Sequence, residues 1–300
     1  MSEPGPDVSG LPEDERARQS VEALERGGLP LEAEARITRQ RQAGAWTSDL
    51  SVQELAAIRS VGFTPVGQVM GSSVYKLGWL GYYNCSYGWG FTTTELTAYA
   101  EGLHAARRLA LDRMREEARQ LGAQGVAGVR LRFRAFEDIR GAVEFTAIGT
   151  GIGVEGAAAP RRPFASGLDG QAFAKLMRAG FVPCGLVIGV SAVHVHTGWF
   201  AQSAQMSWSN VEIVDFSQAV AHARTLAMSR LHADARQHGA DGTVGNQIDI
   251  NVWPVPCNAQ REGEDHVIQF VALATSVARF ETGARPEPKL QVRLIDRRSM

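Results

Sequence analysis

Two long stretches of the chain carry apolar residues at every third or fourth position. This spacing places the apolar side chains on one face of an amphipathic helix. The faces correspond position by position, so that Phe216 stands in the second stretch where Tyr99 stands in the first. The first face comprises Leu96, Tyr99, Leu103, Ala106, Ala110, Met114, Ala118 and Leu121, and the second comprises Phe216, Val220, Ala223, Ala227, Leu231 and Ala235. We predict two long helices, the first capped by Thr92 with Glu95 and both ended by a left-handed glycine.

After each predicted helix, apolar and polar residues alternate strictly. The apolar positions are Val129, Leu131 and Phe133 in the first copy and Ile248, Ile250 and Val252 in the second. Such alternation predicts a strand with one buried and one polar face. Further β-forming stretches begin at Val143 and Val267 and are predicted to complete two hairpins. Pro254 and Pro256 lie in the second connection, where we expect them to prevent a regular ladder.

Ahead of each long helix the chain repeats one glycine-rich phrase. GFTPVGQVMGSS begins at Gly62, and GFVPCGLVIGVS begins at Gly180. Each phrase follows a predicted short helix, and in the first copy Ser51 and Glu54 have the spacing of a capping box. The phrases predict strands, and because glycine weakens a strand we expect close backbone packing at these glycines. The glycines in question are Gly67, Gly71, Gly185 and Gly189.

The order of elements is the same in the two copies. We therefore predict an α+β fold of two tandem β-α-β-β domains, each with one long helix on a small sheet, preceded by a helical hairpin. The predicted divisions are a disordered start and polar helical hairpin over 1–47, domain 1 over 48–156, a linker over 157–165, domain 2 over 166–282 and a tail over 283–300. Three hundred residues suit two domains of ordinary size.

The composition limits the classes of binding partner that we expect for this chain. The formal net charge of −1 gives no basic field, so nucleic acid is not an expected partner. No apolar run reaches the ~20 residues of a membrane span, and the first residues do not resemble a signal peptide. Three widely spaced cysteines fit reduced thiols rather than a disulfide framework. We expect a cytoplasmic protein with no membrane partner.

The turns after the long helices, GAQGVAGVRLRF and GADGTVGNQIDI, and the strands EFTAIGTGI and QFVALATSV resemble those of the YbjQ-like family, which is often labelled a heavy-metal-binding domain. The first copy departs from the family pattern at Gly125, and the second departs at Thr243 and Asn246. The opening of the first copy resembles a bacterial subgroup that carries two such domains. The resemblance implies a small β-α-β-β fold that assembles into a ring, commonly of five, and it implies no established activity and no agreed metal ligands.

A metal site has one candidate. His194 and His196 lie two apart on a predicted strand, so both imidazoles would face one side and could bind a soft divalent metal, with Cys184 upstream as a third ligand. The alternative is two ordinary half-buried histidines and an inert thiol, since no CxxC or HxxxH spacing is present.

Interface residues have two candidate groups. An aromatic and glycine-rich stretch is predicted either to make subunit or ligand contacts or to pack over the sheet. It contains Trp79, Tyr82, Tyr83, Tyr87 and Trp89. In the second group, Arg130, Arg132 and Arg134 occupy a polar strand face whose counterpart in the second copy carries Asp249. If copies adjoin, the basic face could meet the acidic one.

Enzymatic motifs are absent from the sequence. There is no GxSxG motif, and the GTGIGVEG segment precedes a proline-rich linker rather than a helix, which argues against a dinucleotide or phosphate loop. The first interpretation is a non-enzymatic homo-oligomer that forms a ring or stacked rings. The alternatives are a soft-metal-binding protein and an enzyme with an unrecognised interdomain site.

Overall fold

The two long amphipathic stretches form helices of equal length, α4 (Thr97–Gln120) and α7 (Val214–Gln237). The computed structural model describes residues 11–44, 46–77, 93–135, 139, 141–196, 207–256 and 264–280. Alanine dominates the buried face of α7 and recurs along that of α4, which lets each helix backbone lie close to a sheet. No helix among the described residues is both long and apolar enough to cross a membrane.

Each long helix lies on an antiparallel three-stranded core of its own sheet. The first sheet has the order β1-β4-β3-β5 and the second has the order β2-β6-β8-β7. Their bounds are β1 Thr64–Lys76, β2 Thr93–Glu95, β3 Gly125–Ala135, β4 Ala142–Gly153, β5 Phe164–Ala165, β6 Phe181–Val195, β7 Gly242–Pro256 and β8 Glu264–Arg279. The predicted α+β class, with one long helix on each small sheet, is confirmed.

The two halves exchange short edge strands. β2, which immediately precedes α4, pairs antiparallel with β6 of the second sheet. β5, which precedes the second half, pairs parallel with β3 of the first sheet. The two short helices that precede the glycine phrases, α3 (Val52–Arg59) and α5 (Gly170–Arg178), also pack against each other. The seam between the halves therefore contains backbone pairing as well as side-chain packing.

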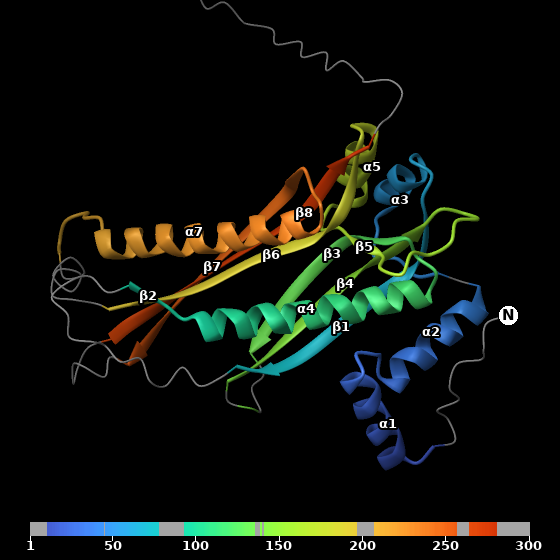
Figure 1. The fold of residues 1–300 in the computed structure, drawn as a ribbon, viewed down its shortest axis with the longest axis horizontal. Helices are drawn as coiled ribbons and strands as arrows, with labels where there is room; N and C mark the ends of the chain where they lie inside the picture. The colour runs from blue at the N-terminus through green and yellow to red at the C-terminus, as the bar shows by residue number, and fades with distance from the viewer. Residues whose placement is uncertain are drawn as a thin grey trace, which may run out of the picture.

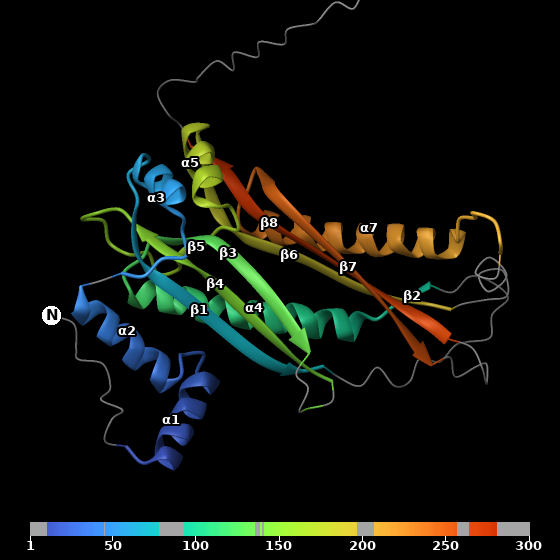
Figure 2. The ribbon, with the colours of Figure 1, turned by 180° about the vertical axis from the view of Figure 1, so that it is seen from behind.

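Helix α4 lies between the sheets. One side of α4 covers the first sheet, where Leu103, Met114 and Phe145 are fully buried. The other side faces the second sheet, whose Ile188 and Val190 belong to the same apolar cluster. Helix α7 covers the opposite face of the second sheet with a separate cluster. Figures 1 and 2 show α7, the second sheet, α4 and the first sheet following one another.

The predicted helical hairpin consists of α1 (Glu13–Glu25) and α2 (Leu31–Ala43). It lies beside the carboxyl-terminal half of α4 (Figure 1). Arg36 forms an ion pair of 2.6 Å with Glu117, which is 3% exposed and also accepts a hydrogen bond from the Met70 backbone N–H. One buried carboxylate therefore joins α2, α4 and β1.

The glycine phrase brings each strand against its helix. A Cβ at Gly71 would overlap the Ala110 carbonyl oxygen of α4, and one at Gly189 would overlap the Ala227 carbonyl oxygen of α7. Two residues further on, the Ser73 hydroxyl donates to Ala106 O at 2.7 Å; its counterpart in β6 makes the equivalent bond to α7. The predicted close backbone packing is confirmed at Gly71 and Gly189, whereas Gly67 and Gly185 approach side chains instead.

Two local predictions were wrong. Glu95 lies in β2, and α4 starts after Leu96 without a side-chain cap. Pro254 and Pro256 lie within the β7 ladder, which tolerates them because β7 is the outer strand of its sheet. The predicted domain divisions stay a prediction, and the end of the linker 157–165 contains β5, at the edge of β3.

We predict that Gly189→Ala destabilises the protein by about 3 kcal/mol or more, because the added methyl group has no space beneath α7. Chemical denaturation measures the loss. The control is Gly242→Ala, since a Cβ at Gly242 meets nothing within 4 Å. Equal stabilities for the two variants would contradict the close packing.

Candidate functional site

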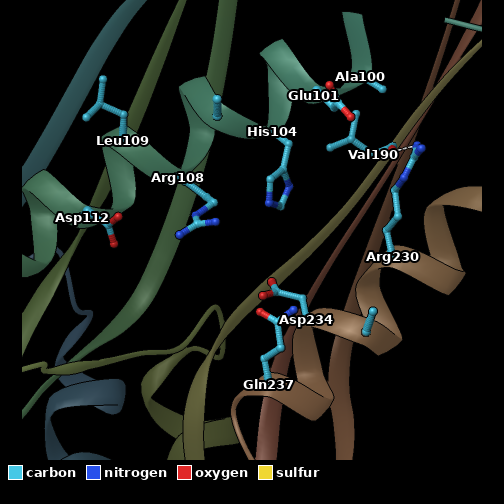
Figure 3. Close-up of a pocket in the computed structure, with 12 residues that line it drawn as sticks. Ala100, Glu101, His104, Arg108, Leu109, Asp112, Val190, Arg230, Asp234 and Gln237 are labelled. Carbon is cyan, nitrogen blue, oxygen red and sulfur yellow. Dashed lines mark hydrogen bonds between the residues drawn. The ribbon is translucent and has the colours of Figure 1, made fainter. Parts of the chain in front are cut away.

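A cleft lies between α4 and α7 at the seam of the two halves. It has a volume of about 570 Å³ and is walled by both helices and by β6. In Figure 3, His104 and Arg108 extend from α4 toward Asp234 and Gln237 on the last turns of α7. Because the cleft lies between halves that are far apart in the sequence, spacing along the chain gave no signal for it.

One rim of the cleft is fixed by Arg230. Its guanidinium donates to the Val190 carbonyl oxygen at 2.7 Å and to the Glu95 carboxylate at 2.5 Å. Glu95 belongs to β2, so this ion pair holds the exchanged strand against α7. The Arg230 guanidinium is therefore engaged in contacts within the protein. Arg108 is the arginine whose side chain points into the cleft (Figure 3).

Asp234 lies one turn further along α7, on the same wall as Arg230. Its carboxylate accepts a hydrogen bond of 3.2 Å from the Ile188 backbone N–H. Glu117 makes the same contact with Met70 in the first half, where Arg36 of α2 covers it. The same structural position is thus covered by the hairpin in one half and faces a cleft in the other.

Two histidines border this wall. Burial lowers the pKa of His104; Asp234 opposes that shift and Arg108 adds to it. Burial also lowers the pKa of His238, again against Asp234 and together with Arg115, Arg162 and Arg108. Both imidazoles are thereby biased toward the neutral form. Among the described residues that line the cleft, none is serine, threonine or cysteine.

The structure brings two of the three predicted metal ligands together and places the third far from them. His194 Nε2 lies 3.1 Å and His196 Nδ1 lies 2.9 Å from the two carboxylate oxygens of Asp265, which is 1% exposed. Burial lowers the pKa of His194, and Asp265 opposes this shift. The two histidines therefore converge, on a carboxylate of β8 that the sequence analysis did not single out.

Cys184 does not join them. It lies ten positions before His194 on the same extended strand, which corresponds to roughly 33 Å. Burial raises the pKa of its thiol, so the thiolate that a soft metal requires is disfavoured. Within the described ranges, no group of three or more His, Cys, Asp or Glu side chains is placed to hold a metal ion.

The predicted arginine face is largely engaged within its own half. Arg130 pairs with Asp49, and Arg134 lies 3.5 Å from Glu144. Arg132 and Asp249 line a single cavity of about 440 Å³ between the halves. Asp249 also opposes the burial that lowers the pKa of Arg107 on α4 to about 10. The basic and acidic faces thus approach each other inside one chain.

The aromatic candidates Trp79, Tyr82, Tyr83, Tyr87 and Trp89 lie outside the described residues.

The apolar face that alternation predicts for the second copy lies on β7, and its side chains are exposed rather than buried. Ile248, Ile250 and Val252 on β7 are 51%, 43% and 50% exposed. Alternation predicted the strand but could not show that α7 stops short of it.

Comparison with known proteins gives two kinds of match. The YbjQ family model, described as "Putative heavy-metal-binding", matches residues 86–155. The encapsulin nanocompartment protein Rv1762c of Mycobacterium tuberculosis is 34% identical over 251 residues, which cover 81% of this chain and 90% of that protein. UPF0145 protein TTHA1944 of Thermus thermophilus is 44% identical over 61 residues, which cover 20% of this chain and 52% of that protein.

The cleft histidines predict a pH dependence of stability. A lowered folded-state pKa means that the unfolded chain binds protons more readily. The stabilisation is present above the unfolded pKa of about 6.5 and is lost as the pH falls below it. The urea midpoint should therefore drop between pH 7 and pH 5, and His104→Gln combined with His238→Gln should reduce that drop. An unchanged pH dependence in the double variant would contradict the assignment.

Proposed function

Because the chain belongs to the family of the encapsulin nanocompartment protein Rv1762c of Mycobacterium tuberculosis, we propose that it is a non-enzymatic, cytoplasmic assembly protein that works as a component of such a compartment. The observation that carries this proposal is the extent of the similarity, which covers 90% of that relative and so includes more than one domain-sized unit. The names of the similar proteins state no catalytic activity.

We further propose that the chain is a tandem of two YbjQ-like domains. The family model matches only residues 86–155, in the first half. Apart from the short strands β2 and β5, the second half repeats the order of helices and strands of the first, and it repeats the glycine contact with the long helix and the serine hydrogen bond. A paired hydroxyl contact also recurs, from Ser48 to Thr150 and from Ser166 to Thr275.

Duplication restricts the assemblies that such a chain can form. If each chain fills two neighbouring positions, whole chains cannot close a ring of five positions. We therefore propose either a ring with an even number of domains or two stacked rings, each of which uses one domain per chain.

We propose that the contact between chains differs from the contact between the halves of one chain. The face of the second sheet that receives α4 carries Val190 and Val271, which are 1% and 8% exposed. The corresponding strand rows of the first sheet carry Ser72 and Thr146, which suit water better than an apolar helix. The exposed apolar stripe of β7 is a better candidate, because β7 pairs with β8 alone among the described strands.

We predict that the purified protein contains several chains and that Ile250→Lys lowers its mass, because the ammonium group would have to be buried in the interface. Native mass spectrometry measures both. Val52→Lys is the control, since Val52 is 82% exposed and lies on α3, away from β7. A monomeric wild type would contradict the assembly function, whereas an unchanged mass for Ile250→Lys would contradict only the role of β7.

The soft-metal alternative remains a second proposal, favoured by the convergence of His194 and His196 on one side of β6. It predicts that elemental analysis of the purified protein finds a stoichiometric divalent ion. His194→Ala combined with His196→Ala should remove that ion, while Cys184→Ala should leave it in place because Cys184 lies far along the strand. Equal metal content in the wild type and the double histidine variant would reject this alternative.

A further inference from the structure

The cleft between α4 and α7 continues into a smaller inner cavity of about 160 Å³. The two spaces share four lining residues, which are His104, Arg108, Asp234 and Gln237. The inner cavity adds Arg115 from α4, Arg162 from the segment between the halves and His238 from the end of α7. Three separate parts of the chain thus bring basic groups to one small space.

Positive charge exceeds negative charge around the inner cavity. Arg108, Arg115 and Arg162 supply three guanidinium groups. Asp234 faces them, but one of its oxygens already accepts the Ile188 N–H. Among the residues that line the inner cavity, three guanidinium groups therefore face one carboxylate. Asp112, which lines the outer cleft, lies 3.1 Å from Arg115 and 3.8 Å from Arg162.

Two buried nitrogen atoms at this cavity have no hydrogen-bond partner in the structure. They are Nε of Arg115, a residue that is 8% exposed, and Nδ1 of His238. Most buried polar groups in proteins are paired, so two unpaired atoms at one cavity require an explanation. The Arg115 Nε–H is a donor, and His238 Nδ1 becomes one when it carries the ring proton. An acceptor with several oxygen atoms would satisfy both.

The first half shows the same position filled. There Arg36 of α2 reaches Glu117, the counterpart of Asp234. The side-chain amide of Gln40 occupies the space over Gly67, and the ring of His238 lies over the corresponding Gly185. The second half has no helix like α2 among the described residues, so the equivalent groove remains open as the cleft and its inner cavity.

We propose that the inner cavity binds a phosphate group and that the outer cleft holds the small organic body to which that phosphate is attached. The Arg115 Nε–H and the Arg108 guanidinium donate to the phosphate oxygens, and His238 adds a third donor. Charge-assisted hydrogen bonds from guanidinium groups are the usual means of holding phosphate. The body of the ligand contacts the apolar side chains of the outer cleft, among them Ala100, Leu109 and Val190.

Such a ligand would bridge the two halves, because Arg108 and Arg115 belong to α4 and His238 follows α7. The proposal does not depend on assembly. The site is built within one chain and lies at the seam, while the apolar stripe of β7 is a separate surface.

Isothermal titration of the full-length protein with inorganic phosphate and with phenyl phosphate tests the proposal, with acetate at the same ionic strength as the third arm. We expect saturable binding of one phosphate per chain, tighter binding of phenyl phosphate because its ring enters the outer cleft, and no saturable binding of acetate. Arg108→Gln should weaken phosphate binding about tenfold or more, since it removes a charged hydrogen-bond donor. Arg108 is exposed on α4, so its replacement should leave the fold intact.

Arg59→Gln is the matched control, because Arg59 is exposed on α3 and lies outside the cavity. A second measurement follows the NMR signals of the His238 ring, which should shift on titration with phosphate. Absence of saturable phosphate binding would overturn the proposal. An equal loss of affinity in Arg59→Gln, or an affinity for acetate equal to that for phosphate, would also overturn it, because each indicates nonspecific attraction of anions.

Discussion

The close approach of each long helix to the strand beneath it is the constraint on which the rest of the structure depends. At Gly71 and Gly189 the strand has no side chain on the helix side, and the carbonyl groups of α4 and α7 occupy that space. Ser73 then donates to a helix carbonyl group, so the contact is polar as well as tight. Small alanine side chains beside these contacts, among them Ala110 and Ala227, let each helix lie this close.

With this geometry, α4 packs against both sheets. Because α4 lies low over the first sheet, its other side remains available to the apolar face of the second sheet. The exchanged strands β2 and β5 then fix the seam by backbone pairing, and the Arg230 and Glu95 ion pair holds β2 in place.

Two surfaces with different chemistry follow from this arrangement. The seam retains a cleft, because the described residues provide no counterpart of α2 to fill the equivalent groove beside the second sheet. The outer strand β7 retains an apolar stripe, because α7 covers β6 and β8 but does not reach it. Binding of a small polar ligand and association with other chains can therefore occur at separate places.

The sequence by itself determined the elements of this protein. Periodicity predicted α4 and α7, alternation predicted β3 and β7, and the repeated glycine phrase predicted where strand and helix backbones meet. These features depend on neighbours within a few residues or on one helix face, so a local pattern contains them.

Only the tertiary structure decided which elements the halves exchange and which charges meet. The sequence predicts Glu95 in a helix cap, whereas it lies in a strand of the other half's sheet, paired with Arg230. Cys184 and His194 share a strand but lie far apart along it, while His194 meets Asp265 on β8. Arg115 and His238 come together at a cavity although they are distant in sequence. Such contacts depend on how two sheets pack across one helix, and no spacing along the chain specifies that packing.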